Sequence, residues 1–336
     1  MKTIQFPVTG EPRDVLQCVD ASVPQPKHGQ VLVRMLASPV NPSDMMFIRG
    51  IYGVQPQLPA TPGFEGVGIV EGSGGGLRGR LFKGKRVVVL NQSGGNWAEY
   101  AIAPADRVIP VSSHLSVEQA ATFFVNPATA WVMTREVLKV PQGAWLLQTA
   151  AGSSLGRMVI RLGNHCGFRT VNVVRREAQA AELKAEGANQ VVVFDPEHHK
   201  ADDLRDSLRQ IVGDQGVRYA IDPVGGATGS AVVRSLGPGG RMLVYGTLSP
   251  QPLQFGSRDL MTQAATIEGF WLSRYMAGIG LARKLRLFRR IERLIRDGIL
   301  ATTIGRTWSL EQVTEAVAAS ENSDVDGKQL LSISDA

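Results

Sequence analysis

The first third of the chain alternates hydrophobic and polar residues in short runs that proline and glycine separate. Such runs, rich in β-branched residues, are typical of strands that turn one face toward a core. They occupy residues 30–37, 66–71, 84–90 and 97–103, and the glycine-rich stretch at 72–76 marks a turn between two of them. The pattern predicts a compact β-rich domain at the start of the chain.

The pattern changes near Ser116, which stands three residues before Gln119 in the arrangement of a helix N-terminal cap. A helical stretch over 129–140 follows, and short apolar runs then alternate with amphipathic segments. We expect strands at 144–148, 170–174, 190–194, 219–222 and 241–245, joined by helices at 155–166, 178–186, 201–212 and 227–236. Near-continuous apolar strands separated by helices are typical of a parallel sheet covered on both faces. The middle of the chain is therefore predicted to be a doubly wound α/β domain.

One more strand, at 267–272, a long basic helix and a β-like end at 329–333 complete the predicted elements. The helix runs from Leu281 to Asp297 and carries an apolar stripe at spacings of three or four, formed by Leu281, Leu285, Phe288, Ile291 and Ile295. This stripe predicts a face toward the core. The expected layout is one β-rich domain, formed by 1–122 and 263–336, with the doubly wound domain inserted at 123–262.

Composition narrows the classes of protein that fit this layout. With 43% hydrophobic and 20% charged residues, the 336-residue chain resembles an ordinary globular enzyme. No apolar stretch is long enough to cross a membrane, and the first residues lack a signal or presequence pattern, so we expect a cytoplasmic protein. Two cysteines, Cys18 and Cys166, are too few for a disulfide framework. The net charge of +6 fits an anionic cofactor or substrate better than nucleic acid, because basic residues are dispersed and aromatics scarce.

A turn of small residues lies between the first strand and the first helix of the doubly wound domain. On the dinucleotide fingerprint G-x-G-x-x-G its three positions are Ala151, Ser153 and Gly156. Small residues permit a tight turn, and the following helix offers free N–H groups and its dipole to a pyrophosphate. Such turns also begin helices in proteins that bind nothing, but the preceding strand and following helix favour a nucleotide site.

The next predicted strand ends at Arg175 and Arg176, where NAD-specific sites place an acidic residue for the ribose 2′-hydroxyl. A guanidinium forms paired hydrogen bonds with phosphate oxygens, so this pair favours the 2′-phosphate of NADPH. The alternative is a solvated pair at a strand end.

The sequence contains few residues in the spacings typical of a metal site or of a catalytic nucleophile. His165 and Cys166 are adjacent, and neighbouring side chains on a helix diverge, so they cannot chelate one ion. His198 and His199 stand in a polar loop and are more typical of solvated histidines. The serine-hydrolase motif G-x-S-x-G is absent. We therefore predict no metal site and expect hydride transfer completed by one acid.

Short motifs along nearly the whole chain resemble the trans-2-enoyl-thioester (enoyl-CoA and enoyl-ACP) reductases, in the zinc-independent branch of the medium-chain dehydrogenase/reductase superfamily. They are NPSD at 41–44, IRGIYG at 48–53, PATPGFEG at 59–66, VNPATA at 125–130, NVVR at 172–175, GFWL at 269–272 and KQL at 328–330. The resemblance implies an α/β protein with a GroES-like β-rich catalytic domain and an inserted Rossmann domain.

The resemblance also implies NADPH as the cofactor and Tyr52 as the catalytic residue. Tyr52 would donate a proton, or a hydrogen bond, to the developing enolate while hydride adds to the β-carbon of the enoyl thioester, a role that suits a phenol. The family's cofactor contacts map onto Asn126, Gly152, Ser153, Ser154, Leu155, Gly156, Arg175, Arg176, Tyr245, Gly246, Thr247, Leu248, Phe270, Trp271, Leu272 and Lys328. Two motif residues have plainer interpretations: Trp271 as a core tryptophan that closes the domain interface, and Asp44 as a helix cap.

Quinone oxidoreductases offer the main alternative, because they share this fold, lack zinc and often carry a tyrosine near position 52. Their turn is usually richer in glycine than the one around Ser153, and they usually lack Phe-Trp-Leu at 270–272, which favours the enoyl thioester over a quinone or an α,β-unsaturated ketone. A nucleotide-binding protein without catalysis is a third hypothesis, which requires Tyr52 to be dispensable.

The basic face of the helix from Leu281 to Asp297 is either only solvated or attracts an acidic partner. In the second case Arg283, Lys284, Arg286 and Arg290 would attract the phosphates of CoA or an acyl-carrier protein. A homodimer is expected from the family resemblance alone.

Overall fold

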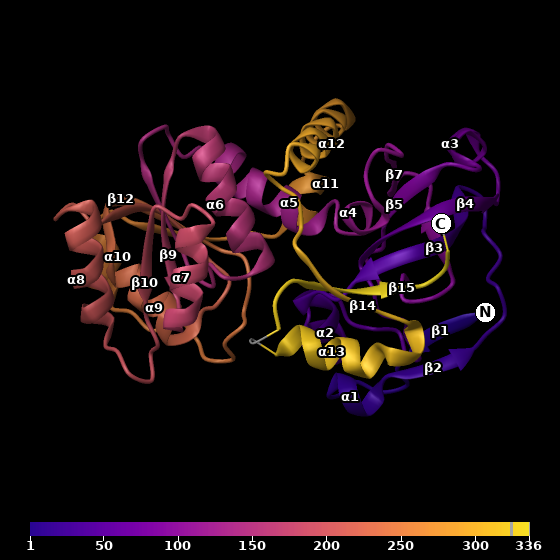
Figure 1. Cartoon of the computed structure of the whole chain (residues 1–336), viewed down its shortest axis with the longest axis horizontal. Coiled ribbons are helices and arrows are strands. Elements are labelled where there is room, and N and C mark those ends of the chain that lie inside the picture. The colour runs from indigo at the N-terminus through magenta and orange to yellow at the C-terminus, as the bar shows by residue number, and fades with distance from the viewer. Residues whose placement is uncertain (323–324, 336) are drawn as a thin grey trace. The chain divides into compact units, whose positions relative to one another are not determined.

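The computed structural model describes residues 1–322 and 325–335 and divides the chain into two compact units (Figure 1). The terminal unit comprises Met1–Val125 and Thr302–Ala336, and the central unit comprises Asn126–Ala301. Both chain ends belong to the terminal unit, so the central unit is an insertion, as the sequence predicts. No helix within the described residues is both long and apolar enough to cross a membrane.

The terminal unit is built mainly from antiparallel strands. Among the described residues its main sheet follows the order β14–β15–β3–β4–β5–β7, with β6 paired to β3 and with β1 and β2 forming a separate pair. The strands are β1 (Lys2–Gln5), β2 (Gln17–Asp20), β3 (Gln30–Pro39), β4 (Glu65–Ser73), β5 (Arg86–Leu90), β6 (Tyr100–Pro104), β7 (Val108–Pro110), β14 (Ile304–Trp308) and β15 (Lys328–Ser332). The helices are α1 (Pro12–Val15), α2 (Pro42–Ile48), α3 (Leu77–Phe82), α4 (Val117–Ala121), the 3-10 turn η2 (Leu310–Gln312) and α13 (Val313–Glu321).

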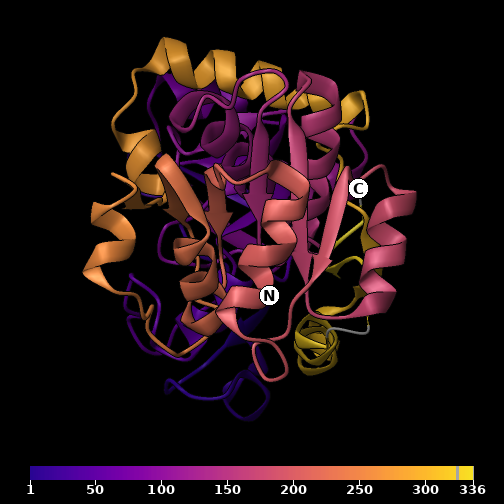
Figure 2. The ribbon, with the colours of Figure 1, turned by 90° about the vertical axis from the view of Figure 1, so that its left-hand side faces the viewer.

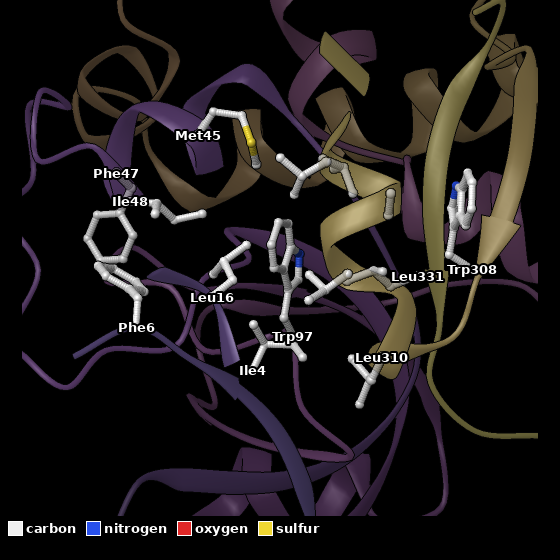
Figure 3. Packing of buried hydrophobic residues seen from close by; sticks show 14 of the residues in the cluster. Ile4, Phe6, Leu16, Met45, Phe47, Ile48, Trp97, Trp308, Leu310 and Leu331 are labelled. Carbon is white, nitrogen blue, oxygen red and sulfur yellow. The ribbon is translucent and has the colours of Figure 1, made fainter. Parts of the chain in front are cut away.

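Alternation along the strands accounts for the core of this unit. On β3, Val31, Val33 and Met35 are fully buried, whereas the residues between them reach the surface or the opposite face. A second cluster gathers around Trp97 and includes residues from both ends of the chain, such as Phe6 and Leu331 (Figure 3). The two ends of the chain are therefore held together by a shared hydrophobic core. The predicted cap at Ser116 is confirmed, because its side chain accepts a hydrogen bond from the backbone of Gln119.

The central unit is a doubly wound α/β domain, which confirms the predicted fold class. Its strands run side by side in the order β10–β9–β8–β11–β12–β13, all parallel to their neighbours (Figure 2). They are β8 (Trp145–Gln148), β9 (Arg169–Val174), β10 (Gln190–Val193), β11 (Val217–Asp222), β12 (Leu236–Val244) and β13 (Thr266–Gly269). The helices are α5 (Val125–Trp131), the π-helix η1 (Val132–Val137), α6 (Ser154–Cys166), α7 (Glu177–Ala185), α8 (Ala201–Val212), α9 (Gly226–Arg234), α10 (Ser257–Met261), α11 (Leu272–Ala277) and α12 (Leu281–Arg296).

The second boundary between the units lies later in the chain than the sequence predicts. The sequence pattern assigns 263–301 to the β-rich domain, whereas the structure places this segment in the central unit. The reason is that β13 pairs in parallel with β12 and so extends the central sheet. This strand ends at Gly269, three residues before the predicted end, because the chain turns into α11.

The predicted apolar stripe of the basic helix is partly wrong. Leu281 and Leu285 are 55% and 45% exposed, whereas Leu287 and Leu294 are buried beside the correctly predicted Ile291 and Ile295. The buried residues of α12 begin at Leu287, so its first turns have no core beneath them. The first half of α12 therefore exposes leucines among basic residues.

Candidate nucleotide and catalytic sites

The small-residue turn of the central unit ends in the N-terminus of α6, which has 13 residues. Ser153 is its N-cap, and its hydroxyl oxygen accepts a hydrogen bond of 3.1 Å from the backbone N–H of Gly156. The N–H groups of Ser154 and Leu155 meet no acceptor within residues 1–322 and 325–335. Unpaired N–H groups at the positive end of a helix dipole bind phosphate well. The turn therefore offers an anion site where the fingerprint predicts one.

Gly156 is required by a close approach of backbone to backbone. A Cβ atom at this position would lie 2.4 Å from the carbonyl oxygen of Ala151, closer than real Cβ contacts come. Ala151 is itself fully buried, and the preceding Ala150 adopts a positive φ of 48°. The helix thus begins directly against the turn, which explains why the third glycine of the fingerprint remains when the first two are replaced.

A buried polar network lies beneath this turn. Gln148, on β8, donates hydrogen bonds to the carbonyl oxygen of Gly156 at 3.0 Å and to the side chain of Asn172 at 2.7 Å. Asn172, on β9, donates in turn to the Thr170 hydroxyl at 3.0 Å. Buried polar side chains are stable only when hydrogen-bonded, so this network fixes the start of α6 to two neighbouring strands. The sequence analysis did not identify Gln148 as part of the site.

Asp222 fixes the loops beside the turn. It ends β11, is fully buried, and accepts hydrogen bonds from the Thr149 hydroxyl and from the backbone N–H groups of Val224 and Gly225, the latter two at 3.1 and 2.8 Å. Burial raises the pKa of this carboxyl group. Its backbone oxygen accepts the N–H of Tyr245 at 3.0 Å, which connects β11 to the predicted cofactor loop 245–248.

The remaining predicted cofactor residues of the central unit lie just beyond the ends of its strands. Arg175 follows β9, is exposed, and its guanidinium meets no partner within the described residues. Arg176 is half-buried as the N-cap of α7. Thr247 and Leu248 are exposed after β12. Because carboxyl ends of parallel strands meet at one edge, these residues share the edge occupied by the turn.

Residues 270–272 follow β13 at the same edge. Phe270 packs its ring 6.3 Å from that of Tyr275, and Leu272 begins α11. Trp271 is 44% exposed, so its interpretation as a core tryptophan is wrong. Asn126 lies at the other end of this unit's chain, in α5.

Tyr52 belongs to the terminal unit and stands in the loop after α2. Its backbone N–H donates to the carbonyl oxygen of Met46 at 3.2 Å, which holds the loop to the helix. Its ring is half-buried and packs against Phe64, with ring centroids 5.1 Å apart. The loop and Phe64 together fix the phenol's orientation.

Four polar residues form a cluster beside this loop, which we call the buried acid cluster: Asn41, Asp44, Glu65 and Lys328. Asp44 and Glu65 are buried. Asp44 accepts the backbone N–H groups of Asn41 at 2.8 Å and Phe64 at 3.1 Å, so its predicted capping role is confirmed. Glu65 accepts from the Asn41 side chain at 3.0 Å and from the backbone N–H of Val125 at 2.9 Å. The cluster thus joins α2 and β4 to Val125, the last residue of the first of the two chain segments that form the terminal unit.

Lys328, which the resemblance assigns to the cofactor, lies in this cluster. Its ammonium group donates a hydrogen bond of 2.9 Å to the side-chain oxygen of Asn41. Desolvation lowers the pKa of Lys328, and the charges of Glu65 and Asp44 oppose that change. Burial raises the pKa of Glu65 and raises that of Asp44 to about 7. The charges of Lys328 and the two acids therefore depend on one another.

One group of possible metal ligands occurs within the described residues, namely Asp195, Glu197 and His198. Both Glu197 and His198 are exposed, and an Asp195 oxygen already accepts the Glu197 backbone N–H at 3.2 Å. The group contains no cysteine, so it does not fit a zinc site of the Cys, His and acid type.

Comparisons with known proteins agree with this architecture. The Alcohol dehydrogenase GroES-like domain family matches residues 27–113, and the Zinc-binding dehydrogenase family matches residues 154–284. The mitochondrial enoyl-[acyl-carrier-protein] reductase of Bos taurus is 32% identical over 96% of this chain and 86% of its own length. The chain belongs to the medium-chain dehydrogenase/reductase superfamily. It is an oxidoreductase of that superfamily.

Two solved structures of the superfamily extend the comparison. A Bacillus thuringiensis protein, provisionally named an NADPH:quinone reductase, is 32% identical, covers 98% of both chains and has a TM-score of 0.89. Etr1p, solved with NADP and crotonyl-CoA, is 26% identical over 98% of this chain and 99% of its own, with a TM-score of 0.83. The identities favour neither a thioester nor a quinone substrate.

The tight turn makes a prediction about Gly156. Substitution Gly156→Ala forces a methyl group against the Ala151 carbonyl and should lower the free energy of unfolding by about 1–3 kcal/mol. It should also weaken NADP⁺ binding, because the N-terminus of α6 shifts. Chemical denaturation and calorimetric titration measure the two effects. The control is Gly269→Ala, where a Cβ meets nothing within 4 Å; equal behaviour of the two variants would contradict the argument.

The raised pKa of Asp44 predicts a pH dependence of stability. With a folded-state pKa of about 7 against an ordinary value of 3.8, the folded chain holds a proton that the unfolded chain releases between these values. The stability that this group contributes is complete below about pH 4 and is lost as the pH rises to about 7. The unfolding free energy of wild type relative to Asp44→Asn should therefore fall over this range in urea titrations. Parallel pH profiles would show that Asp44 is ionised throughout.

Proposed function

We propose that the chain reduces the carbon–carbon double bond of a trans-2-enoyl thioester, of CoA or of an acyl-carrier protein, with NADPH. The observation that carries this proposal is the position of Tyr52, held by α2 and Phe64, in a chain with enoyl-[acyl-carrier-protein] reductase relatives along nearly its whole length. Etr1p, which covers 98% of this chain, binds NADP together with crotonyl-CoA, an enoyl thioester.

The central unit fits NADPH. The free N–H groups of Ser154 and Leu155 suit its pyrophosphate, and Arg175 presents an unpaired guanidinium to a 2′-phosphate. When bound, NADPH supplies the hydride that adds to the β-carbon of the thioester. The other proposed contacts are Asn126, the residues 152–156, Arg176, Tyr245, Gly246, Thr247, Leu248, Phe270, Trp271, Leu272 and Lys328.

Tyr52 is proposed to donate its phenolic proton or a hydrogen bond where the thioester carbonyl gains negative charge. A donor fixed in advance stabilises this charge without a reorganisation cost at the moment of reaction. The ring of Tyr52 packs on Phe64, and the backbone N–H of Phe64 donates a hydrogen bond to Asp44. These contacts hold the phenol in place. A phenol is an acid that can supply the proton this chemistry needs.

Reduction of a quinone or an α,β-unsaturated ketone is the second candidate. It is favoured by the Bacillus thuringiensis structure, which has the same 32% identity as the bovine thioester reductase and a TM-score of 0.89. Both reactions begin with hydride addition to an electron-poor substrate. The feature that distinguishes them is the fixed proton donor, which the proposed thioester reduction needs.

The partner of a thioester substrate is proposed to meet α12. Its basic residues Arg283, Lys284, Arg286 and Arg290 are proposed to meet the phosphates of CoA or an acidic acyl-carrier protein, and of these Arg283 already pairs with Glu136 at 2.6 Å. A homodimer is proposed on the family resemblance, and Etr1p and Etr2p of Candida tropicalis form a heterodimer. A cytoplasmic location stays a prediction, because the bovine relative is named as mitochondrial.

Tyr52→Phe tests the catalytic proposal. With crotonyl-CoA and NADPH, the variant should lose about 100-fold or more in kcat with little change in KM, because the phenol acts mainly in the transition state. The assay follows NADPH oxidation with crotonyl-CoA, a longer enoyl thioester and a quinone. Tyr100→Phe, on β6 of the same unit, is the matched control. Quinone turnover that ignores Tyr52, together with no thioester turnover, would transfer the assignment to the second candidate.

Arg175→Ala tests the choice of cofactor. Losing a charge-assisted bond to the 2′-phosphate should raise KM for NADPH by about 10-fold or more and leave KM for NADH nearly unchanged. Arg218→Ala removes another exposed arginine of the central unit and should change neither value. If wild type uses NADH and NADPH equally well, Arg175 does not select the cofactor.

A further inference from the structure

A cavity of about 260 Å³ lies within the central unit and is lined by four arginines. Arg205 and Arg209 come from α8, Arg234 ends α9, and Arg258 lies in α10. The cavity also includes Gly216, immediately before β11, and the start of β12. Like charges repel, so four guanidinium groups around one small space favour an anion between them.

Two acids, Asp214 and Asp259, also line this cavity, but neither forms an ion pair with Arg234 or Arg258 among the residues that the structure describes. Arg205 pairs with Asp202 at 2.9 Å and Arg209 with Asp206 at 3.6 Å, each within one turn of α8. Asp259 lines the cavity, but its carboxylate accepts the Gly256 backbone N–H at 2.9 Å and caps α10.

Three donors in the cavity remain without an acceptor. The guanidinium groups of Arg234 and Arg258 have no hydrogen-bond or ion-pair partner within residues 1–322 and 325–335. The Nε atom of Arg205 is buried and likewise has no partner. An unpaired buried donor is costly, and an oxyanion in the cavity would satisfy it.

The location separates this cavity from the nucleotide turn. It lies at the amino ends of β11 and β12, whereas the turn and Arg175 follow the carboxyl ends of their strands. In a doubly wound sheet the cofactor binds at the carboxyl ends. An anion in the arginine cavity would therefore be a second ligand.

We propose that the arginine cavity binds the phosphate of a small phosphorylated molecule, independently of the nucleotide. Guanidinium groups form paired hydrogen bonds with phosphate oxygens, which suits the two unpaired arginines. Arg234 also lines an adjoining cavity of about 390 Å³, which contains Phe194 and His199 with their rings stacked 5.9 Å apart. The adjoining cavity offers an apolar and aromatic surface to the organic part of a phosphate ester.

Calorimetric titration of the full chain tests this site, with saturating NADP⁺ present and ionic strength held constant with chloride. The probes are inorganic pyrophosphate and AMP. Either probe should bind saturably, and Arg234→Ala/Arg258→Ala should weaken binding by about 10-fold or more. Tighter binding of AMP assigns the site to a phosphate ester, and tighter binding of pyrophosphate assigns it to an inorganic ion.

Arg218→Ala is the matched control, because Arg218 is an exposed arginine on β11 outside the cavity. It should leave both titrations unchanged. The double variant removes exposed side chains without partners, so its thermal unfolding should match wild type. Saturable binding of neither probe, or equal binding by wild type and the double variant, would overturn the proposal. Neither result depends on the enoyl-thioester assignment.

Discussion

Burying two carboxylates is costly, and the terminal unit is organised around offsetting that cost at Asp44 and Glu65. Each accepts hydrogen bonds from backbone or amide N–H groups of separate segments, so each connects parts of the chain that are distant in sequence. Lys328 brings a positive charge to this cluster, and its ammonium group donates a hydrogen bond to the side chain of Asn41. The loop that carries Tyr52 begins at the helix that this cluster caps, so the proposed proton donor depends on it.

In the central unit the corresponding constraint is a close approach of backbone. Gly156 brings the first turn of α6 against Ala151, and the side chain of Gln148 donates a hydrogen bond to the carbonyl oxygen of Gly156. Asp222 fixes the neighbouring loop in the same way. The two units thus share one principle: hydrogen-bonded buried polar side chains hold the loops that contain groups available to ligands.

The elements with strong local patterns could be predicted from the sequence. Buried parallel strands give continuous apolar runs, and the turn at 150–156 could be recognised because it lies between such a strand and a helix. β13 was assigned to the wrong domain because it is a four-residue strand whose partner, not its pattern, decides where it belongs. The stripe on α12 was misplaced because the helix repeat alone does not tell which turns have a core beneath them.

The buried acid cluster could not be found from local signals. Glu65 stands alone in an apolar stretch, and the hydrogen bond between Lys328 and Asn41 joins residues 287 positions apart. Only the family resemblance placed Tyr52 and Lys328 among the functional residues. The arginine cavity was missed for the same reason, since its four arginines are spread over three helices.

The insertion of the central unit also determines the order in which the protein can form during synthesis. β15 lies between β14 and β3 in the main sheet, and Leu331 packs into the cluster that contains Phe6. The first 125 residues therefore emerge from the ribosome without an inner strand of their own sheet. The central unit is complete in one continuous segment and can fold as soon as it is made. Until the last residues arrive, the end of β3 at residues 37–39 lacks its partner β15, whereas β6 already pairs with residues 30–34 of the same strand.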